Sequence, residues 1–225
     1  MMREMAMHIR SFNPAGLVGL VGMIFSVLTC SSANAQNDKL SGFPAMVLGG
    51  QTAKATIVQF SVPFDNLIRL ADKDVSLGKT KLDEIQALAG GTVQGHSTSS
   101  GKTAWLCYEI TGDNLPRRIW FISDGLNKKK GDGAILNLIA AEVITDKSAK
   151  CGQPRIDLSN LELPIPALKD DKRALEKRLG KVKAKQFARY SNEHKVSGET
   201  VEQSLVYRLD GDRIAGVAFS QATAQ

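Results

Sequence analysis

The chain has 225 residues, of which 43% are hydrophobic and 23% charged, a composition typical of a globular protein with a buried core. This composition excludes a wholly disordered chain, a collagen and a coiled coil. Lysine and arginine number 29 against 23 acidic residues, and the net charge of +6 is too small to indicate a nucleic-acid-binding protein.

Residues 1–35 have the pattern of a secretory signal peptide. Arg3 and Arg10 precede an apolar run of about 14 residues, shorter than the roughly 20 that a membrane-spanning helix needs. Ala33-Asn34-Ala35 then resembles a cleavage site. We expect export to the periplasm or the medium after cleavage near Ala35. Two alternatives stay open: a lipoprotein anchored at Cys30, whose preceding residues resemble an imperfect lipoprotein box, and an uncleaved anchor.

Two cysteines, Cys107 and Cys151, remain after cleavage. An even pair in an exported chain indicates one disulfide, because the compartment is oxidising. Two buried free thiols are the alternative. Neither cysteine belongs to a C-x-x-C pair, so we expect no redox catalysis.

Short apolar runs between turn residues predict strands, and helical periodicity predicts two helices. In the first half, the predicted elements are a strand at 56–62, a helix from Thr80 to Gly90, and strands at 104–110, 118–123 and 134–143, the last of which could also be helical. In the second half, they are a helix from Asp170 or Asp171 to Gly180 and strands at 186–190, 204–209 and 214–220. Residues 151–166 contain three prolines and predict a linker.

The order of one helix and then three strands therefore occurs twice. We predict an α+β fold of two tandem units, each a short helix packed on an antiparallel sheet. The first unit spans residues 36–150 and the second spans 167–225, on either side of the linker.

The residues around the first helix, Leu77-Gly78-Lys79-Thr80, Ile85 and Leu88-Ala89-Gly90, resemble the SmpA/OmlA (BamE-like) envelope-domain family. In tandem, such units are also similar to the fold of the beta-lactamase inhibitor protein. The resemblance covers most of residues 65–221, although the second copy has Leu168-Lys169-Asp170 in place of Gly-x-Thr. It implies a non-enzymatic, protein-binding module of the bacterial envelope, and it implies no particular partner.

Side-chain alternation along the strands predicts which face of the sheet meets solvent. Glu109 and Arg118 mark one face as the solvent side, and that face also carries both tryptophans. Exposed tryptophan beside arginine is typical of an interface hot spot. The alternative is that the tryptophans belong to the core. The predicted interface residues are Trp105, Glu109, Arg118, Trp120 and Arg208.

The sequence contains no convincing catalytic, cofactor-binding or metal-binding motif. Residues 95–103 (GHSTSSGKT) miss the phosphate-loop spacing by one residue and precede a predicted strand, whereas that loop must open a helix. His96 and His194 lack metal-ligand spacing. We therefore expect no cofactor and no metal, and the sequence favours a protein that is not an enzyme.

Residues 169–189, from Lys169 to Arg189, hold nine basic residues against three acidic ones. A solvated helix face followed by a lysine-protected edge strand explains this charge. The functional alternative is contact with an anionic membrane surface or an acidic partner.

These patterns predict an exported scaffold or assembly factor that binds an envelope or secreted protein through an open sheet face. The alternatives are an inhibitor of a secreted enzyme, and a hydrolase or ligand-binding protein whose site is built from loops. An aliphatic cavity between the two halves would favour a lipophilic ligand.

Overall fold

The structure is a computed structural model that describes residues 39–98, 101–111, 114–125, 134–145, 150–159, 161, 163–181 and 183–224. The predicted signal peptide and Cys30 lie outside these residues. The helices and strands are α1 (Phe43–Leu48), β1 (Ile57–Phe60), β2 (Leu67–Leu70), β3 (Lys73–Ser76), α2 (Leu82–Ala89), β4 (Gln94–Thr98), β5 (Gly101–Ile110), β6 (Arg117–Ser123), β7 (Leu138–Val143), α3 (Lys172–Leu179), β8 (Phe187–Val196), β9 (Glu199–Asp210) and β10 (Arg213–Ala224).

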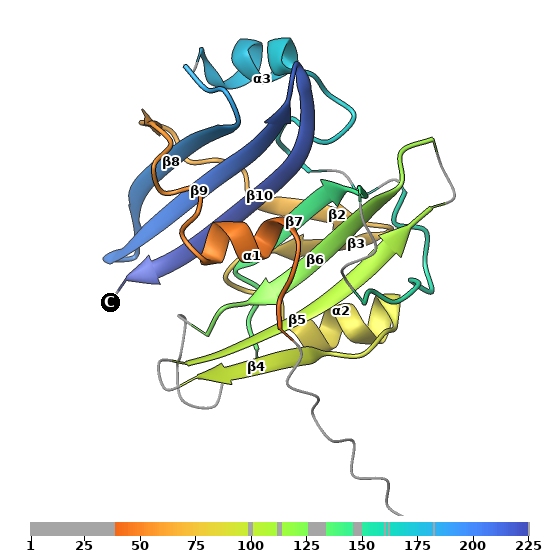
Figure 1. Ribbon diagram of the computed structural model, residues 1–225. Coiled ribbons are helices and arrows are strands. Elements are labelled where there is room, and N and C mark those ends of the chain that lie inside the picture. The colour runs from red at the N-terminus through yellow and green to blue at the C-terminus, as the bar shows by residue number, and fades with distance from the viewer. Residues whose placement is uncertain are drawn as a thin grey trace, which may run out of the picture. The chain divides into compact units, whose positions relative to one another are not determined.

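Most of the strands belong to one large sheet. Its eight strands lie in the order β1-β8-β9-β10-β7-β6-β5-β4, and all neighbours are antiparallel except β1 and β8, which run parallel. The hairpin of β2 and β3 forms a separate two-stranded sheet. Figure 1 shows α1 on one side of the large sheet, across β10 and β7, and α2 with the β2–β3 hairpin on the other.

The predicted fold class is wrong. Of the described residues, 46% are strand and 13% helix, and within them a large eight-stranded mixed sheet with three short helices replaces two helix-on-sheet units. The physical reason lies at the centre of the sheet, where β7 and β10 pair from Glu142–Gly216 to Leu138–Ser220. This pairing satisfies two strand edges that separate units would leave open. The predicted domain boundaries stay predictions, and the described residues of 151–166 include no helix or strand.

Most of the predicted elements are present, with ends shifted by a few residues. Both predicted helices form, and residues 138–143 adopt the strand rather than the helix. The sequence patterns missed α1, the β2–β3 hairpin and β4. The two halves of the sheet have similar element orders, because α2 precedes β5, β6 and β7 as α3 precedes β8, β9 and β10, but the first half has the additional strand β4 between α2 and β5.

The core has a layer on each face of the sheet. The larger layer lies beneath α2, α3 and the β2–β3 hairpin, and includes Tyr108, Phe121, Tyr207 and Phe219. The smaller layer lies beneath α1 and is built around Phe43, Trp105 and Trp120. Neighbouring residues on one strand, such as Trp120 and Phe121, therefore enter different layers, as strand alternation requires.

A tyrosine ties each of the helices α2 and α3 to the strands in the same way. Tyr108 on β5 donates its hydroxyl to the Gly90 carbonyl at 2.6 Å, and Tyr190 on β8 donates to the Gly180 carbonyl at 3.2 Å. Both glycines end their helices at positive φ, +77° and +81°, a conformation that glycine adopts without steric cost. The two halves thus hold their helices by the same contact.

Burial changes the ionisation of all three tyrosines of the chain. Burial raises the pKa of Tyr108 to about 12, although the nearby positive charge of Arg155 lowers it to a smaller extent. Burial also raises the pKa of Tyr190 to about 12, and the negative charge of Glu176 contributes to this rise. Burial, with Tyr190 and Asp170 nearby, raises the pKa of Tyr207 well above 10.

We expect these shifts to make the fold sensitive to alkali. The phenols of the unfolded chain ionise near pH 10, so ionisation favours unfolding between about pH 10 and 12. The free energy of unfolding should be independent of tyrosine ionisation below about pH 10 and fall as the pH rises toward 12. Ultraviolet titration of tyrosinate, compared with urea unfolding at each pH, measures both effects. A folded protein whose tyrosines ionise at their ordinary pKa would contradict this prediction.

Candidate functional site

The predicted interface residues lie together on one face of the sheet, but most are buried. Trp105, Trp120 and Arg118 are at most 2% exposed, so the expectation that they form an open surface is wrong and the core alternative holds for both tryptophans. Glu109 and Arg208 retain more exposure, with side chains 29% and 20% accessible. The reason is α1, which the sequence patterns did not predict and which packs over this face.

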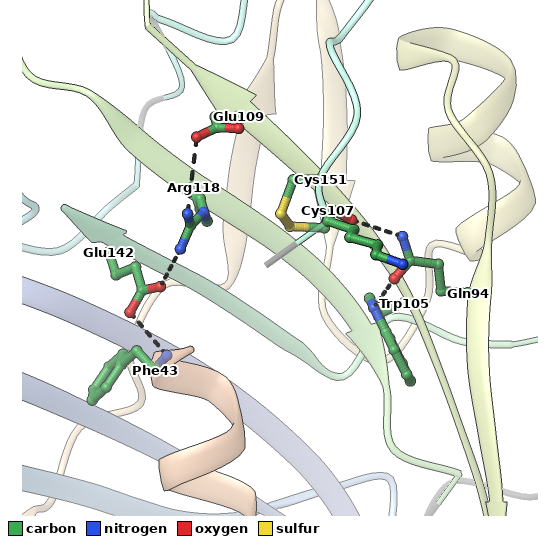
Figure 2. Close-up of a disulfide and its surroundings, with 9 residues drawn as sticks. Phe43, Gln94, Trp105, Cys107, Glu109, Arg118, Glu142 and Cys151 are labelled. Carbon is green, nitrogen blue, oxygen red and sulfur yellow. Dashed lines mark hydrogen bonds and ion pairs between the residues drawn. A yellow bond between two sulfur atoms is a disulfide. The ribbon is translucent and has the colours of Figure 1, made fainter. Parts of the chain in front are cut away.

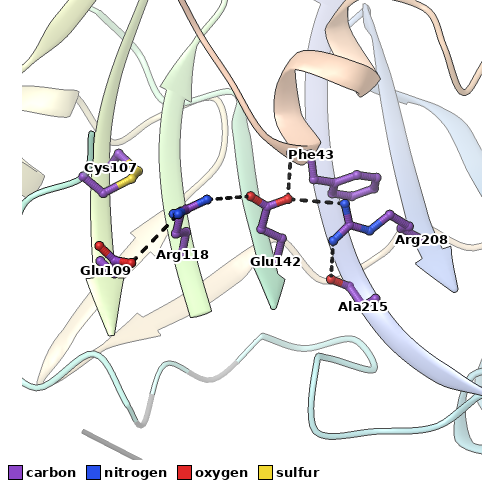
Figure 3. A network of polar contacts seen from close by, with 8 residues as sticks. Phe43, Cys107, Glu109, Arg118, Glu142, Arg208 and Ala215 are labelled. Carbon is purple, nitrogen blue, oxygen red and sulfur yellow. Dashed lines mark hydrogen bonds and ion pairs between the residues drawn. A yellow bond between two sulfur atoms is a disulfide. The ribbon is translucent and has the colours of Figure 1, made fainter. Parts of the chain in front are cut away.

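A buried carboxylate fixes α1 to the sheet. The Glu142 carboxylate on β7 accepts the Phe43 backbone N–H at 2.9 Å, and it lies 3.6 Å from Arg118 Nη1 and 3.5 Å from Arg208 Nη1. Arg118 Nη2 also lies 3.9 Å from Glu109 Oε1. Figure 3 shows these contacts running from Glu109 through Arg118 and Glu142 to Arg208. A branch from Glu142 reaches Phe43, the first residue of α1.

The packing around Glu142 leaves no room for a side chain at position 42. Gly42 has φ +73°, and a Cβ there would approach Glu142 Oε1 to 2.5 Å and the Trp120 ring to 3.0 Å. The Phe43 ring packs beside the Arg208 guanidinium, with 5.6 Å between the ring centroid and Cζ. The Gly42-Phe43-Pro44 segment is therefore the anchor of α1.

The disulfide prediction is confirmed. Cys107 on β5 and Cys151 have Cα atoms 4.8 Å apart and are joined, closing a loop with a sequence separation of 44 residues. Figure 2 shows the disulfide near Trp105, whose indole N–H donates to Gln94 Oε1 on β4 at 2.8 Å. Gln94 Nε2 in turn donates to the Lys150 carbonyl at 3.0 Å. The disulfide and Gln94 together hold the start of the linker against the sheet.

Away from α1, this face has a groove on β1, β8, β9 and β10. Its floor is a row of small side chains that stand opposite one another in register, Ser191, Ser204 and Ser220. We call it the serine groove; it has a volume of about 330 Å³, and its walls include Ile57, Gln59, Arg189, Glu193, Glu202 and Ala222. Serine and alanine produce the depression because their side chains do not reach the level of the longer neighbours.

Two negative charges lie close together in the serine groove. Glu193 and Glu202 face each other directly across β8 and β9, and both are exposed. Neither forms an ion pair with a residue of the described ranges. Like charges directly opposite on neighbouring strands repel each other, so this pair destabilises the free protein slightly. A cationic group placed between the two carboxylates would remove that repulsion.

The remaining candidate residues do not come together. His96 is exposed on β4 at one edge of the sheet, whereas His194 is on β8, near the opposite edge, with its Nδ1 2.7 Å from Asn192 Oδ1. Within the described residues, no group of three or more acidic, histidine or cysteine side chains could hold a metal ion. Residues 99 and 100 of the rejected phosphate-loop match lie outside the described residues.

The basic segment 169–189 consists of α3 and the residues on either side of it in the sequence. Asp171 caps the helix by accepting the Ala174 backbone N–H at 2.8 Å, and Lys177 and Arg178 occupy its last turn, where positive charge favours the helix dipole. Most of the described basic side chains of the segment are exposed. Among the helices of the described ranges, none is long and apolar enough to cross a membrane. Contact with an anionic surface stays a prediction.

Comparison with protein-family models, curated proteins and solved structures finds no match for this chain. The resemblance to the SmpA/OmlA family and to the beta-lactamase inhibitor protein stays a prediction from the sequence.

Replacing Glu142 should release α1 and destabilise the fold. In Glu142→Gln the buried Arg118 loses a carboxylate that lies 3.6 Å from its Nη1, and we expect the free energy of unfolding in urea to fall by about 3–5 kcal/mol. Acrylamide should then quench the two tryptophans more strongly. Glu109→Gln is the matched control, because Glu109 is at the exposed end of the network and should cost less than about 1 kcal/mol. Equal losses in the two variants would contradict this account.

Removing the disulfide should also destabilise the protein. For a loop of this length, the loss in Cys107→Ser with Cys151→Ser should be about 3–4 kcal/mol if the bond acts by restricting the unfolded chain. Thermal unfolding of the oxidised protein, the reduced protein and the double variant measures the loss. The reduced protein and the double variant should unfold at similar temperatures, and a reduced protein as stable as the oxidised one would contradict the prediction.

Proposed function

We propose that this protein is an exported, non-enzymatic binding module that recognises another protein through the serine groove. The single observation that carries the proposal is the facing pair Glu193 and Glu202 beside a floor of small side chains. Two carboxylates held opposite each other form a receptor for a lysine or arginine side chain, and the serine hydroxyls supply hydrogen-bonding groups around it.

Export is part of this proposal, and the disulfide supports it. Disulfides persist in the periplasm and outside the cell and are rare in the cytosol. The partner is therefore an envelope or secreted protein. We infer that it presents a basic side chain to Glu193 and Glu202 and an apolar contact to Ile57, which is 42% exposed at the edge of the groove.

The test is site-specific photo-crosslinking in cells, with the full-length chain. The crosslinking residue replaces Ile57 at the edge of the groove. The matched control replaces Leu67, a similarly exposed aliphatic residue (44%) on the separate β2–β3 hairpin. A crosslinked envelope or secreted protein is expected from position 57 and not from position 67.

The partner's basic side chain is tested by charge reversal. Glu193→Lys and Glu202→Lys should each lower the crosslinking yield at position 57 by about tenfold, because a lost charge pair at an interface costs more than about 1.4 kcal/mol. Asp72→Lys, in the exposed β2–β3 turn, should leave the yield unchanged. Three results would overturn the proposal: equal crosslinks from positions 57 and 67, a yield insensitive to both glutamate reversals, or a second copy of this chain as the captured protein.

A further inference from the structure

We propose a second binding site on the opposite face of the sheet, for an aliphatic chain that carries an anionic head group. The site is the cavity where the two halves of the sheet meet. There α2 belongs to the first half and α3 to the second, and the linker rather than a helix covers the junction of β7 and β10. This site is independent of the serine groove.

The floor of the cavity is a row of apolar side chains in register across three strands. Ile119 on β6 stands opposite Ala141 on β7, and Ala141 stands opposite Val217 on β10. Ala141 is the smallest member of the row and lies at its centre, so the floor is lowest at the junction. All three side chains line the cavity.

The walls of the cavity come mainly from the linker and the residues that directly follow it, and they are largely aliphatic. We call the site the linker cavity; it measures about 520 Å³, and its remaining apolar lining is Leu115, Leu161, Leu163, Ile165, Ala167 and Leu168. Binding sites for small molecules have roughly 300–1,000 Å³ and a mainly apolar lining.

Polar contacts hold the linker over the cavity. Arg117 donates to the Leu115 carbonyl and to the Ser159 carbonyl, each at 2.9 Å. At the other end, the Asp170 carboxylate accepts the Ala167 backbone N–H at 2.8 Å. These contacts hold the wall at both ends, while the cavity itself is half open to solvent. A wall that is already held in place reduces the entropic cost of binding.

The charged side chains around the cavity favour an anionic head group. Among the described residues that line it, Lys169 and Arg117 are cationic and Asp170 is the one carboxylate. Asp170 already accepts a backbone N–H, and Arg117 is buried against two carbonyls. Lys169 is exposed at the mouth of the cavity, where its ammonium group can meet a carboxylate or phosphate while the chain stays inside.

Isothermal titration calorimetry with the complete oxidised protein tests the site. The probes are decanoate, a decanoyl lysophospholipid with an anionic head, decanol, and decyltrimethylammonium. Decanoate or the lysophospholipid should bind at least about tenfold more tightly than decanol and the cationic probe. Whichever anion binds more tightly identifies the source, a free fatty acid or a lipid. Absent binding of both anions, or equal binding of the cationic probe, would overturn the proposal.

Two kinds of variant locate the binding. Ala141→Leu places a larger side chain on the floor of the cavity. Ala167→Trp places a large side chain at the half-buried position 167 of the wall, outside the sheet. Each should weaken binding of the anion by about tenfold or more. The second variant keeps the test valid if the first does not fold, as circular dichroism would reveal. Unchanged affinity in a folded variant of either kind would contradict the location.

A matched pair of charge-reversal variants tests the contact with the head group. Lys169→Glu should weaken binding of the anionic probe about tenfold and leave decanol binding unchanged, whereas Lys185→Glu, an exposed lysine of the same basic segment outside the cavity, should change neither. Glu193→Lys in the serine groove should leave both affinities unchanged. Failure of the two proposals is thus distinguishable, because each site has variants that do not touch the other.

Discussion

The buried Glu142 carboxylate is the constraint on which the arrangement of this sheet depends. It stands on β7 at the centre of the sheet, and its partners come from β6, β9 and the first turn of α1. A buried carboxylate is tolerated only where positive charge and hydrogen bonds compensate its lost hydration. Arg118, Arg208 and the Phe43 N–H supply that compensation, so the position of α1 and the joining of the two halves are set by one group.

The two candidate sites follow from where this constraint leaves the sheet uncovered. On the α1 face, the helix closes the centre of the sheet, and the serine groove begins where its cover ends. On the other face, α2 and α3 each cover their own strands, and the linker cavity remains between them. Both sites therefore lie at places where the sheet continues beyond the helices that pack on it.

The sequence predicted local features well and the arrangement of the halves poorly. Strand alternation, the helix-ending Gly90 and Gly180, and the cysteine pair are readable from the chain itself. The pairing of β7 with β10 joins Ala141 to Val217, and nothing local to either strand specifies its partner. The burial of Arg118 was missed because alternation assigns a charged residue to solvent unless its partner, here Glu142, is known. The six-residue α1 is too short to show helical periodicity.

The strand β7 shows how one short segment serves both faces. Ala140 faces α1 and pairs with Ala218, whereas Ala141 faces the linker cavity and pairs with Val217. On the α1 side, the small pair and the nearby Gly216, where a Cβ would approach the Phe43 ring to 3.0 Å, let the helix lie close to the sheet. On the other side, Ala141 lies on the floor of the linker cavity, beneath the linker side chains. Adjacent small residues of β7 therefore give tight packing on one face and a cavity on the other, and the segment packed above each face decides which.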